Sequence, residues 1–282
     1  MHLWAILVAM GIAWIIRYPS VSQRGTWSQR WSRSLFLLLF PPLLILSTAI
    51  AILYMGCHGA MLGVKVGSWG CGIAGSYLFW VLASGWQLSY QTQRAIAKLT
   101  SYPQITLDTT TARIIELDLP YSAQIGFWQP QLVVSRGLLD SLTPDQLQAV
   151  LAHEQAHLDY RDTFWFFWLG WIRSWGWWLP NTEALWEELL LLRELRADSQ
   201  AAEKIDFLVL AESLLAVVKA PLESSPAWSA NFNHYGTGDR LQQRIDFLLA
   251  AKQLTSNHPW YGNYWLALVI VPLLTIPLHY YR

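Results

Sequence analysis

Charged residues are scarce in this chain. Asp, Glu, Lys and Arg make up 13% of its 282 residues, against about a quarter in an ordinary soluble domain. The acidic and basic residues balance to a formal net charge of zero, so no excess of positive charge points to a nucleic-acid partner. With 54% hydrophobic residues, the composition instead indicates a membrane protein whose partner is the lipid bilayer.

Cysteine is also scarce, because only Cys57 and Cys71 are present. This count excludes a disulfide framework and a zinc site built from cysteines. The pair could form one disulfide or remain two small apolar residues, and the sequence is compatible with both. Tryptophan, in contrast, occurs 18 times, and it concentrates where a membrane meets water.

Uncharged runs predict four transmembrane helices. Three fall in residues 1–90, at about 3–16, 35–54 and 68–90, and the fourth in residues 259–282. The first run is short, but it lacks the basic start and the small-residue cleavage site of a signal peptide. It therefore favours a retained anchor helix. The second run is long enough to cross a bilayer.

Four arginines between the first two runs predict the orientation. Arg17, Arg24, Arg30 and Arg33 occur there without an acidic residue among them, and such loops stay in the cytoplasm. The N-terminus is then outside the cell, residues 91–258 form a domain on the cytoplasmic side, and the expected location is the plasma membrane.

Residues 91–135 predict a short helix followed by strands at 112–118, 123–128 and 131–135, where β-branched and aromatic residues are enriched. The strands would form a small mixed sheet. An exposed edge of that sheet could hold an extended peptide by strand addition, or the sheet could simply cover the helix that follows.

The segment LTPDQLQAVLAHEQAHLDYRD, residues 142–162, predicts a well-capped helix. Thr143 is a good N-cap and Gln146 completes a capping box with it. His153 and His157 are four residues apart, so both project from one helix face and can bind one metal ion. Glu154 lies beside them as a candidate general base.

A second helix, at residues 182–204, supplies a candidate third ligand. Glu194 and Asp198 lie one turn apart on one face of it, although a solvated charged face is the alternative interpretation. Two histidines and one glutamate are a standard set for a catalytic zinc ion with one position open for water. We therefore expect one Zn²⁺ per chain, bound by His153, His157 and Glu194, with Asp198 orienting a ligating histidine.

The Trp-rich stretch 163–180 separates these two helices. A single crossing of the membrane there would leave Glu194 on the opposite side from the histidines, and no shared metal site could form. The stretch is therefore predicted to be an interfacial segment or a re-entrant hairpin.

At these residues the chain resembles the membrane-bound zinc metallopeptidases of the BlaR/MecR antirepressor type. More distantly it is similar to CAAX prenyl proteases and heat-shock membrane metalloproteases. The resemblance covers about residues 105–205 and rests on HEQAH, the Arg161-Asp162 pair, the segment 193–198 (RELRAD) and the lead-in SRGLLDSLTPDQLQAV. It implies the same three zinc ligands and Glu154 as catalytic acid and base. The antirepressors carry a large extracellular β-lactam-sensing domain after the last span, and none follows before Arg282, so sensing of β-lactams is not expected.

In the prenyl-protease relatives a downstream histidine helps to bind the substrate carbonyl or oxyanion. The resemblance makes His234 the candidate here, with Tyr235 and Arg240 as weaker alternatives, and a polar loop histidine is an equally good interpretation of His234.

The expected fold is a mainly α membrane protein with a small β-sheet, in which a zincin-like metallopeptidase domain is inserted between transmembrane helices. The expected function is zinc-dependent hydrolysis of protein or peptide substrates near the cytoplasmic membrane face. The alternative is a membrane signalling or scaffold protein that keeps a zinc-bound peptidase fold with little turnover and acts through a regulatory partner protein.

Overall fold

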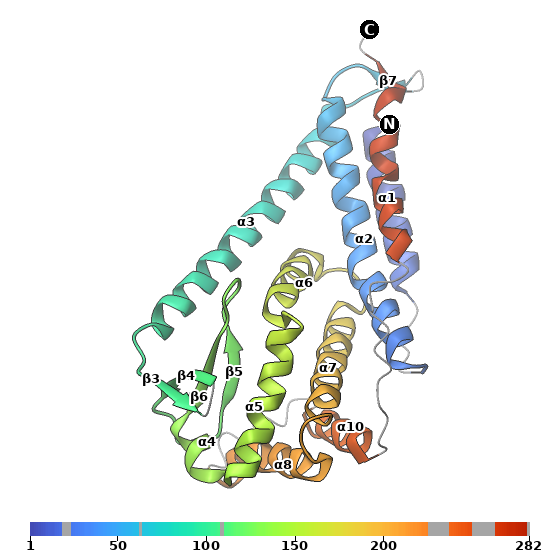
Figure 1. Cartoon of the computed structure of the whole chain (residues 1–282). Helices are drawn as coiled ribbons and strands as arrows, with labels where there is room; N and C mark the ends of the chain where they lie inside the picture. The colour runs from blue at the N-terminus through green and yellow to red at the C-terminus, as the bar shows by residue number, and fades with distance from the viewer. Residues whose placement is uncertain (19–23, 62–63, 108–109, 225–236, 250–262, 281–282) are drawn as a thin grey trace. The chain divides into compact units, whose positions relative to one another are not determined.

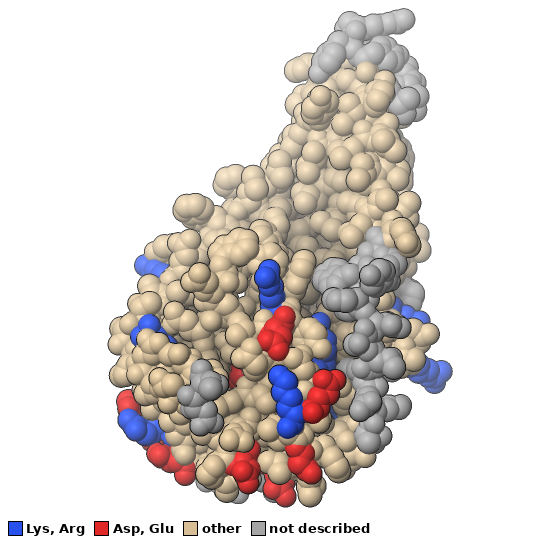
Figure 2. Space-filling model, in the orientation of Figure 1, with Lys and Arg blue, Asp and Glu red and all other residues tan. Residues whose placement is uncertain are grey.

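The computed structural model describes residues 1–18, 24–61, 64–107, 110–224, 237–249 and 263–280. The chain forms two compact units. Unit 1 comprises residues 1–89, 168–190 and 256–282, and unit 2 comprises residues 90–167 and 191–255. Figure 2 draws one face of the molecule, on which acidic and basic side chains are few and most of the described surface is uncharged.

Unit 1 is built around the long helix α2, Trp27–Met55. This helix packs against α1 (His2–Arg17) and against the 3₁₀-type segment η1 (Asn263–Leu278), as Figure 1 shows. It begins at a capping box formed by Thr26 and Gln29, and it continues through Pro41 and Pro42. The beginning of α3 (Ser68–Leu99) completes the unit's core, which includes Ala49, Ile52, Met55, Cys71 and Ala74.

A disulfide joins Cys57 to Cys71, so the structure decides between the two states that the sequence left open. Beside it lies a small sheet in the order β2-β1-β7, formed by Ala60–Met61 (β1), Val64–Lys65 (β2) and His279–Tyr280 (β7). The disulfide and the sheet together tie the α2–α3 connection to the last described residues of the chain.

One helix among the described residues, α2, is both long enough and apolar enough to cross a membrane. Helix α1 and the segment Tyr264–Pro277 are apolar but shorter. Helix α3 has the length but not the mean hydropathy that α2 reaches. Of the four predicted spans, the structure therefore supports the second as a membrane-crossing candidate by length and composition.

The Trp-rich stretch is one helix, α6 (Asp162–Gly176), followed by a turn and then by α7 (Thr182–Ala201). In unit 1, Arg173 near the end of α6 forms an ion pair with Glu183 in the first turn of α7. Leu179 in the turn between them packs with Ala13 of α1 and Ile45 of α2. The turn is thus part of the packed interior of unit 1.

Unit 2 contains a four-stranded sheet in the order β3-β4-β6-β5. The strands are Gln104–Leu107 (β3), Thr110–Ile115 (β4), Ser122–Ile125 (β5) and Gln131–Ser135 (β6). Strands β4 and β6 are parallel and the other pairs antiparallel, so the mixed sheet was predicted correctly and β5 is an edge strand.

Three details of that prediction were wrong. The helix expected after residue 91 is the end of α3, which continues to Leu99 because no glycine or proline interrupts residues 86–99. Strand β3 was not expected, because it has only four residues and two of them, Gln104 and Thr106, are polar and exposed. Strands β4 and β5 also end three residues earlier than expected, at Ile115 and Ile125.

Helices cover the sheet and frame the candidate site. Helix α4 (Arg136–Ser141) follows β6 directly, and α5 (Pro144–Asp159) packs Val150 against Ala112, Leu132 and Val134 of the sheet. Helices α8 (Phe207–Ser224) and α10 (Thr237–Leu249) complete the described part of unit 2, with α8 in contact with both α5 and α10.

Candidate metal centre

Helix α5 begins as the sequence predicts. The Thr143 hydroxyl accepts a hydrogen bond from the Gln146 backbone N–H, and the Gln146 side chain accepts one from the Thr143 N–H. This reciprocal cap fixes where the helix starts and therefore which face each later residue occupies. Both histidines of the HEQAH motif consequently lie on the side of α5 that meets α7, and both are largely buried.

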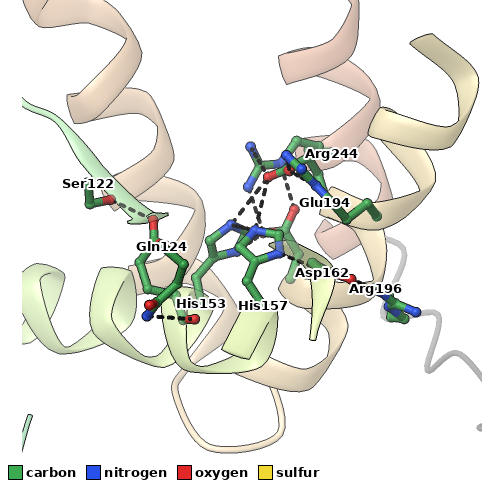
Figure 3. Close-up of polar contacts among 11 residues, drawn as sticks. Ser122, Gln124, His153, His157, Asp162, Glu194, Arg196 and Arg244 are labelled. Atoms are coloured by element: carbon green, nitrogen blue, oxygen red, sulfur yellow. Dashed lines mark hydrogen bonds and ion pairs between the residues drawn. The ribbon is translucent and has the colours of Figure 1, made fainter. Parts of the chain in front are cut away.

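Three potential ligand atoms converge between α5 and α7. The Nε2 atoms of His153 and His157 are 3.0 Å apart, and Glu194 Oε2 lies 3.3 Å from the first and 3.6 Å from the second. Among the described residues this is the one group of three such side chains whose ligand atoms lie close enough to hold a metal ion. Figure 3 shows the two imidazoles and the carboxylate pointing toward one another.

These separations fit a tetrahedral metal ion. Ligand atoms bound to zinc at 2.0–2.2 Å in tetrahedral geometry stand about 3.3–3.6 Å from one another. Two of the three observed separations, 3.3 and 3.6 Å, lie within that range, and the third, 3.0 Å, is about 0.3 Å shorter than its lower limit. The donor set of two imidazoles and one carboxylate also matches catalytic zinc sites with one position left for water.

Each histidine also meets a buried carboxylate through its other ring nitrogen. His157 Nδ1 forms a hydrogen bond of 2.7 Å with Asp162 Oδ2. His153 Nδ1 lies 2.8 Å from Asp198 Oδ1, a short ion-pair contact. Carboxylates in these positions hold Nδ1 protonated, which leaves Nε2 with a lone pair for a metal.

The role of Asp162 was not foreseen, although the residue follows His157 by only five positions. Its place depends on the turn between α5 and α6, where Arg161 adopts a left-handed conformation with φ of 54°. This turn brings Asp162 beside the imidazole of His157. Arg196 of α7 then forms an ion pair with the same carboxylate.

Arginine side chains surround the carboxylates of α7. Arg244 of α10 donates to both oxygens of Asp198, at 2.7 and 2.8 Å, and lies 3.5 Å from Glu194. Arg193 donates two hydrogen bonds to Glu194 Oε1, at 2.9 and 2.6 Å. Arg244 was not predicted, but the sequence held a signal for it: two carboxylates on a buried helix face require a cation nearby.

The charges shift the pKa values of the site in a consistent direction. Burial alone would raise the pKa of Glu194, but Arg193, the two histidines and Arg244 hold it well below its ordinary value. Burial would likewise raise the pKa of Asp198, but Arg244 and His153 outweigh burial and lower it. Burial lowers the pKa of His153, whereas Asp198 and Glu194 raise it more strongly, to about 9. Both carboxylates of α7 are therefore ionised at neutral pH.

Glu154 faces the edge strand of the sheet. Ser122 Oγ of β5 donates a hydrogen bond of 2.8 Å to Glu154 Oε1, and Gln124 Nε2 donates one of 3.4 Å to the Glu154 carbonyl. A cavity of about 240 Å³ lies between these residues and the two histidines. Thr163, Arg193 and Glu194 also line this cavity.

The structure thus brings together five of the six predicted site residues: His153, Glu154, His157, Glu194 and Asp198. His234, and with it Tyr235, lies outside the described residues. Arg240 is described on α10, but it is not among the described residues that line the cavity. The sequence missed Ser122, Asp162 and Arg244, each of which contacts a predicted site residue.

Comparison with known proteins gives one family. Residues 91–170 match the model of peptidase family M48, which supports a metallopeptidase. Neither the curated proteins nor the solved structures contain a match to this chain. The matched stretch includes the sheet and the HEQAH helix but ends before Glu194, so the third ligand rests on the geometry described above.

Proposed function

We propose that this chain is an integral membrane zinc metalloendopeptidase that hydrolyses peptide bonds in protein substrates. The observation that carries the proposal is the convergence of His153 Nε2, His157 Nε2 and Glu194 Oε2 within 3.0–3.6 Å, beside the carboxylate of Glu154. The match of residues 91–170 to a peptidase family supports it independently. We also propose that the chain is of the BlaR/MecR antirepressor type.

His153, His157 and Glu194 would hold the zinc ion. When bound, zinc acts as a Lewis acid and lowers the pKa of a water molecule to about 7. Glu154 accepts the proton of the attacking water and transfers it to the leaving amine. Ser122 holds the Glu154 carboxylate by its hydrogen bond to Oε1, so that the base enters the reaction in a fixed orientation.

The carboxylates and arginines around the ligands act by positioning them. Asp162 and Asp198 keep the two Nδ1 atoms protonated and the imidazole rings oriented. Arg244 neutralises Asp198 and contacts Glu194, which keeps two buried carboxylates from repelling one another. An oxyanion donor such as His234 would complete the machinery.

Strand β5 offers the place for the substrate. Among the described strands it pairs only with β6, so the backbone groups of its other edge remain available for strand addition. Ser122 and Gln124 on this strand line the cavity beside Glu154. An extended segment that pairs with β5 would therefore present its backbone carbonyl to the catalytic residues.

The membrane part of the proposal rests on unit 1. Helix α2 is long and apolar enough to cross a bilayer, and the turn between α6 and α7 packs on α1 and α2. We therefore take this turn as a re-entrant hairpin. Arg17 at the end of α1 donates a hydrogen bond to the Pro180 carbonyl, and Arg30 at the start of α2 forms a bidentate pair with Glu188. By the positive-inside rule, that end of unit 1 and the catalytic residues lie in the cytoplasm.

The decisive experiment is Glu154→Gln in the full chain. The variant should retain zinc, because Glu154 is not a ligand, and it should lose proteolysis by at least 100-fold. Cleavage of a casein-type extended substrate and zinc content are measured on the same preparation. Glu183→Gln is the matched control, because Glu183 pairs with Arg173 in unit 1, outside the cavity.

Unchanged cleavage by Glu154→Gln would refute the assignment of the base. A wild-type chain that binds zinc but cleaves nothing would favour the signalling or scaffold function instead. Comparison of the proteomes of cells with the active and the Glu154→Gln enzyme would identify the substrate.

A further inference from the structure

The turn between β5 and β6 presents two aromatic side chains at one end of the sheet. Its residues are 126–130, with the sequence GFWQP. Gly126 has φ of 142°, which side chains with a Cβ rarely adopt, and a Cβ there would lie 2.8 Å from Pro130 Cα. The backbone of the turn is therefore tightly specified. Trp128 nevertheless leaves 77% of its surface exposed.

Trp128 belongs to a larger patch. The Phe127 ring packs against Phe164 and Phe167 of α6, with ring centroids 5.1 and 4.6 Å apart, and the Trp128 ring centroid lies 5.3 Å from that of Phe164. Trp165, 41% exposed, adjoins Phe164 at 5.1 Å. We call these five residues of unit 2 the aromatic patch: Phe127, Trp128, Phe164, Trp165 and Phe167.

The segments that carry the patch have no charge. Residues 119–135, which include β5, the turn and β6, contain no Asp, Glu, Lys or Arg, and neither do residues 163–172. Other surfaces of unit 2 do carry charge, including the exposed Arg136–Glu116 pair at the opposite end of the sheet. Trp and Phe carried by segments without charged residues are typical of a surface that enters the headgroup region of a bilayer without requiring anionic lipid.

Three of the five patch residues, Phe164, Trp165 and Phe167, lie on α6. Helix α6 continues from Phe167 into unit 1, where Trp171 donates a hydrogen bond to the Val81 carbonyl and Gly176 meets Pro42 of α2. The helix that carries these three aromatic residues therefore also belongs, by its later residues, to the unit that contains α2.

We propose that the aromatic patch is a lipid-binding surface that inserts into the interfacial layer of the bilayer, with Trp128 at its tip. This rests in part on the proposed function, because it also names the substrate class. Ser122 precedes Phe127 by five residues, which span at most about 17 Å in an extended chain. A substrate paired with β5 would thus be cut within about that distance of the membrane surface, so the enzyme would select segments that flank a transmembrane helix.

Site-directed spin labelling of the full chain in lipid nanodiscs tests the insertion. The two native cysteines form a disulfide, so a nitroxide can be attached to Trp128→Cys alone. Leu117→Cys is the aqueous control, because Leu117 is 39% exposed at the opposite end of the sheet between Glu116 and Asp118. Ile50→Cys, 41% exposed on α2, is the lipid control.

The labels at positions 128 and 50 should collide more often with oxygen, which dissolves in lipid, than with a water-soluble nickel chelate. The label at position 117 should show the opposite preference. The preference should be the same in neutral and in anionic lipid. A label at 128 that behaves like the one at 117, while 50 is lipid-exposed, would overturn the proposal. Protection of position 128 from both reagents would overturn it too, because a protein surface would then cover the patch. If position 50 itself is aqueous, the membrane location fails and the inference falls with it.

A cleavage assay tests the substrate class separately. The same extended sequence is offered as a free peptide and joined to a transmembrane helix in the nanodisc. Trp128→Ser should lower cleavage of the anchored form at least tenfold and leave cleavage of the free peptide within twofold. Equal effects on both forms would contradict the membrane role of the patch. Absence of cleavage by the wild type would instead refute the proposed function, and the spin-label result would still decide the insertion.

Discussion

Arg244 supplies the cation that lies against two carboxylates of α7, and Arg244→Met removes it. Asp198 is completely buried, and the Arg244 side chain is 15% exposed. Removing one partner of such a pair leaves an uncompensated charge and costs about 3–5 kcal/mol. We therefore expect the opening free energy of α7 and α10 in the metal-free chain to fall by about this amount.

Zinc affinity should fall as well, by about 10- to 100-fold, because Asp198 would no longer be held against His153 Nδ1. Hydrogen exchange followed by mass spectrometry reports the opening of both helices in the full chain. Zinc affinity is measured by competition with a chelating dye on the same variant.

Two controls make the test specific. Arg136→Met removes an equally bidentate pair with Glu116 that is exposed, and such a pair is expected to change stability little. The double variant Asp198→Leu with Arg244→Met replaces both buried charges, so it should recover stability but not zinc affinity. Normal exchange in α7 together with normal zinc affinity in Arg244→Met would refute the reasoning.

Three further predictions follow from other parts of the chain. Glu194→Ala should lose at least 100-fold in zinc affinity while α5 stays helical, and stoichiometric zinc in that variant, measured by atomic emission, would remove the third ligand. Gly137→Ala should destabilise unit 2 by about 1–3 kcal/mol or more, because the added Cβ would overlap a backbone carbonyl in the loop after β4. Gly72→Ala, where the Cβ meets nothing within 4 Å, should be neutral in the same exchange experiment. Replacing Cys57 and Cys71 together by serine should lower the stability of unit 1 by about 3 kcal/mol, because a bond across 14 residues restricts the unfolded chain; an unchanged melting temperature would contradict this.

Local chemistry explains what could be predicted from the sequence. The capping box at Thr143 and the four-residue spacing of His153 and His157 are short-range signals, and the structure contains both. Helical spacing likewise placed Glu194 and Asp198 on one face of α7, where both contact His153.

Long-range packing explains what could not be predicted. Arg244 reaches Asp198 from 46 positions away, and only the placement of α10 brings the two together. Ser122 contacts Glu154 because β5 is an edge strand. It is at the edge because the strand order β3-β4-β6-β5 places β6 between β4 and β5. Arg17 and Arg30, which the sequence offered only as a sign of orientation, also make partly buried contacts, with Pro180 before α7 and with Glu188 on α7.

The Cys57–Cys71 disulfide has a consequence for where the protein can mature. Such bonds persist in oxidising compartments and are reduced in the cytosol. If α2 crosses a bilayer, its end at Met55 must then face the oxidising side, and its arginine-bearing start must face the reducing side. The redox state of Cys57 and Cys71 therefore reports the orientation of α2 in the membrane without a reporter fusion. A thiol-blocking reagent applied to denatured protein from cells should modify neither cysteine until a reductant is added.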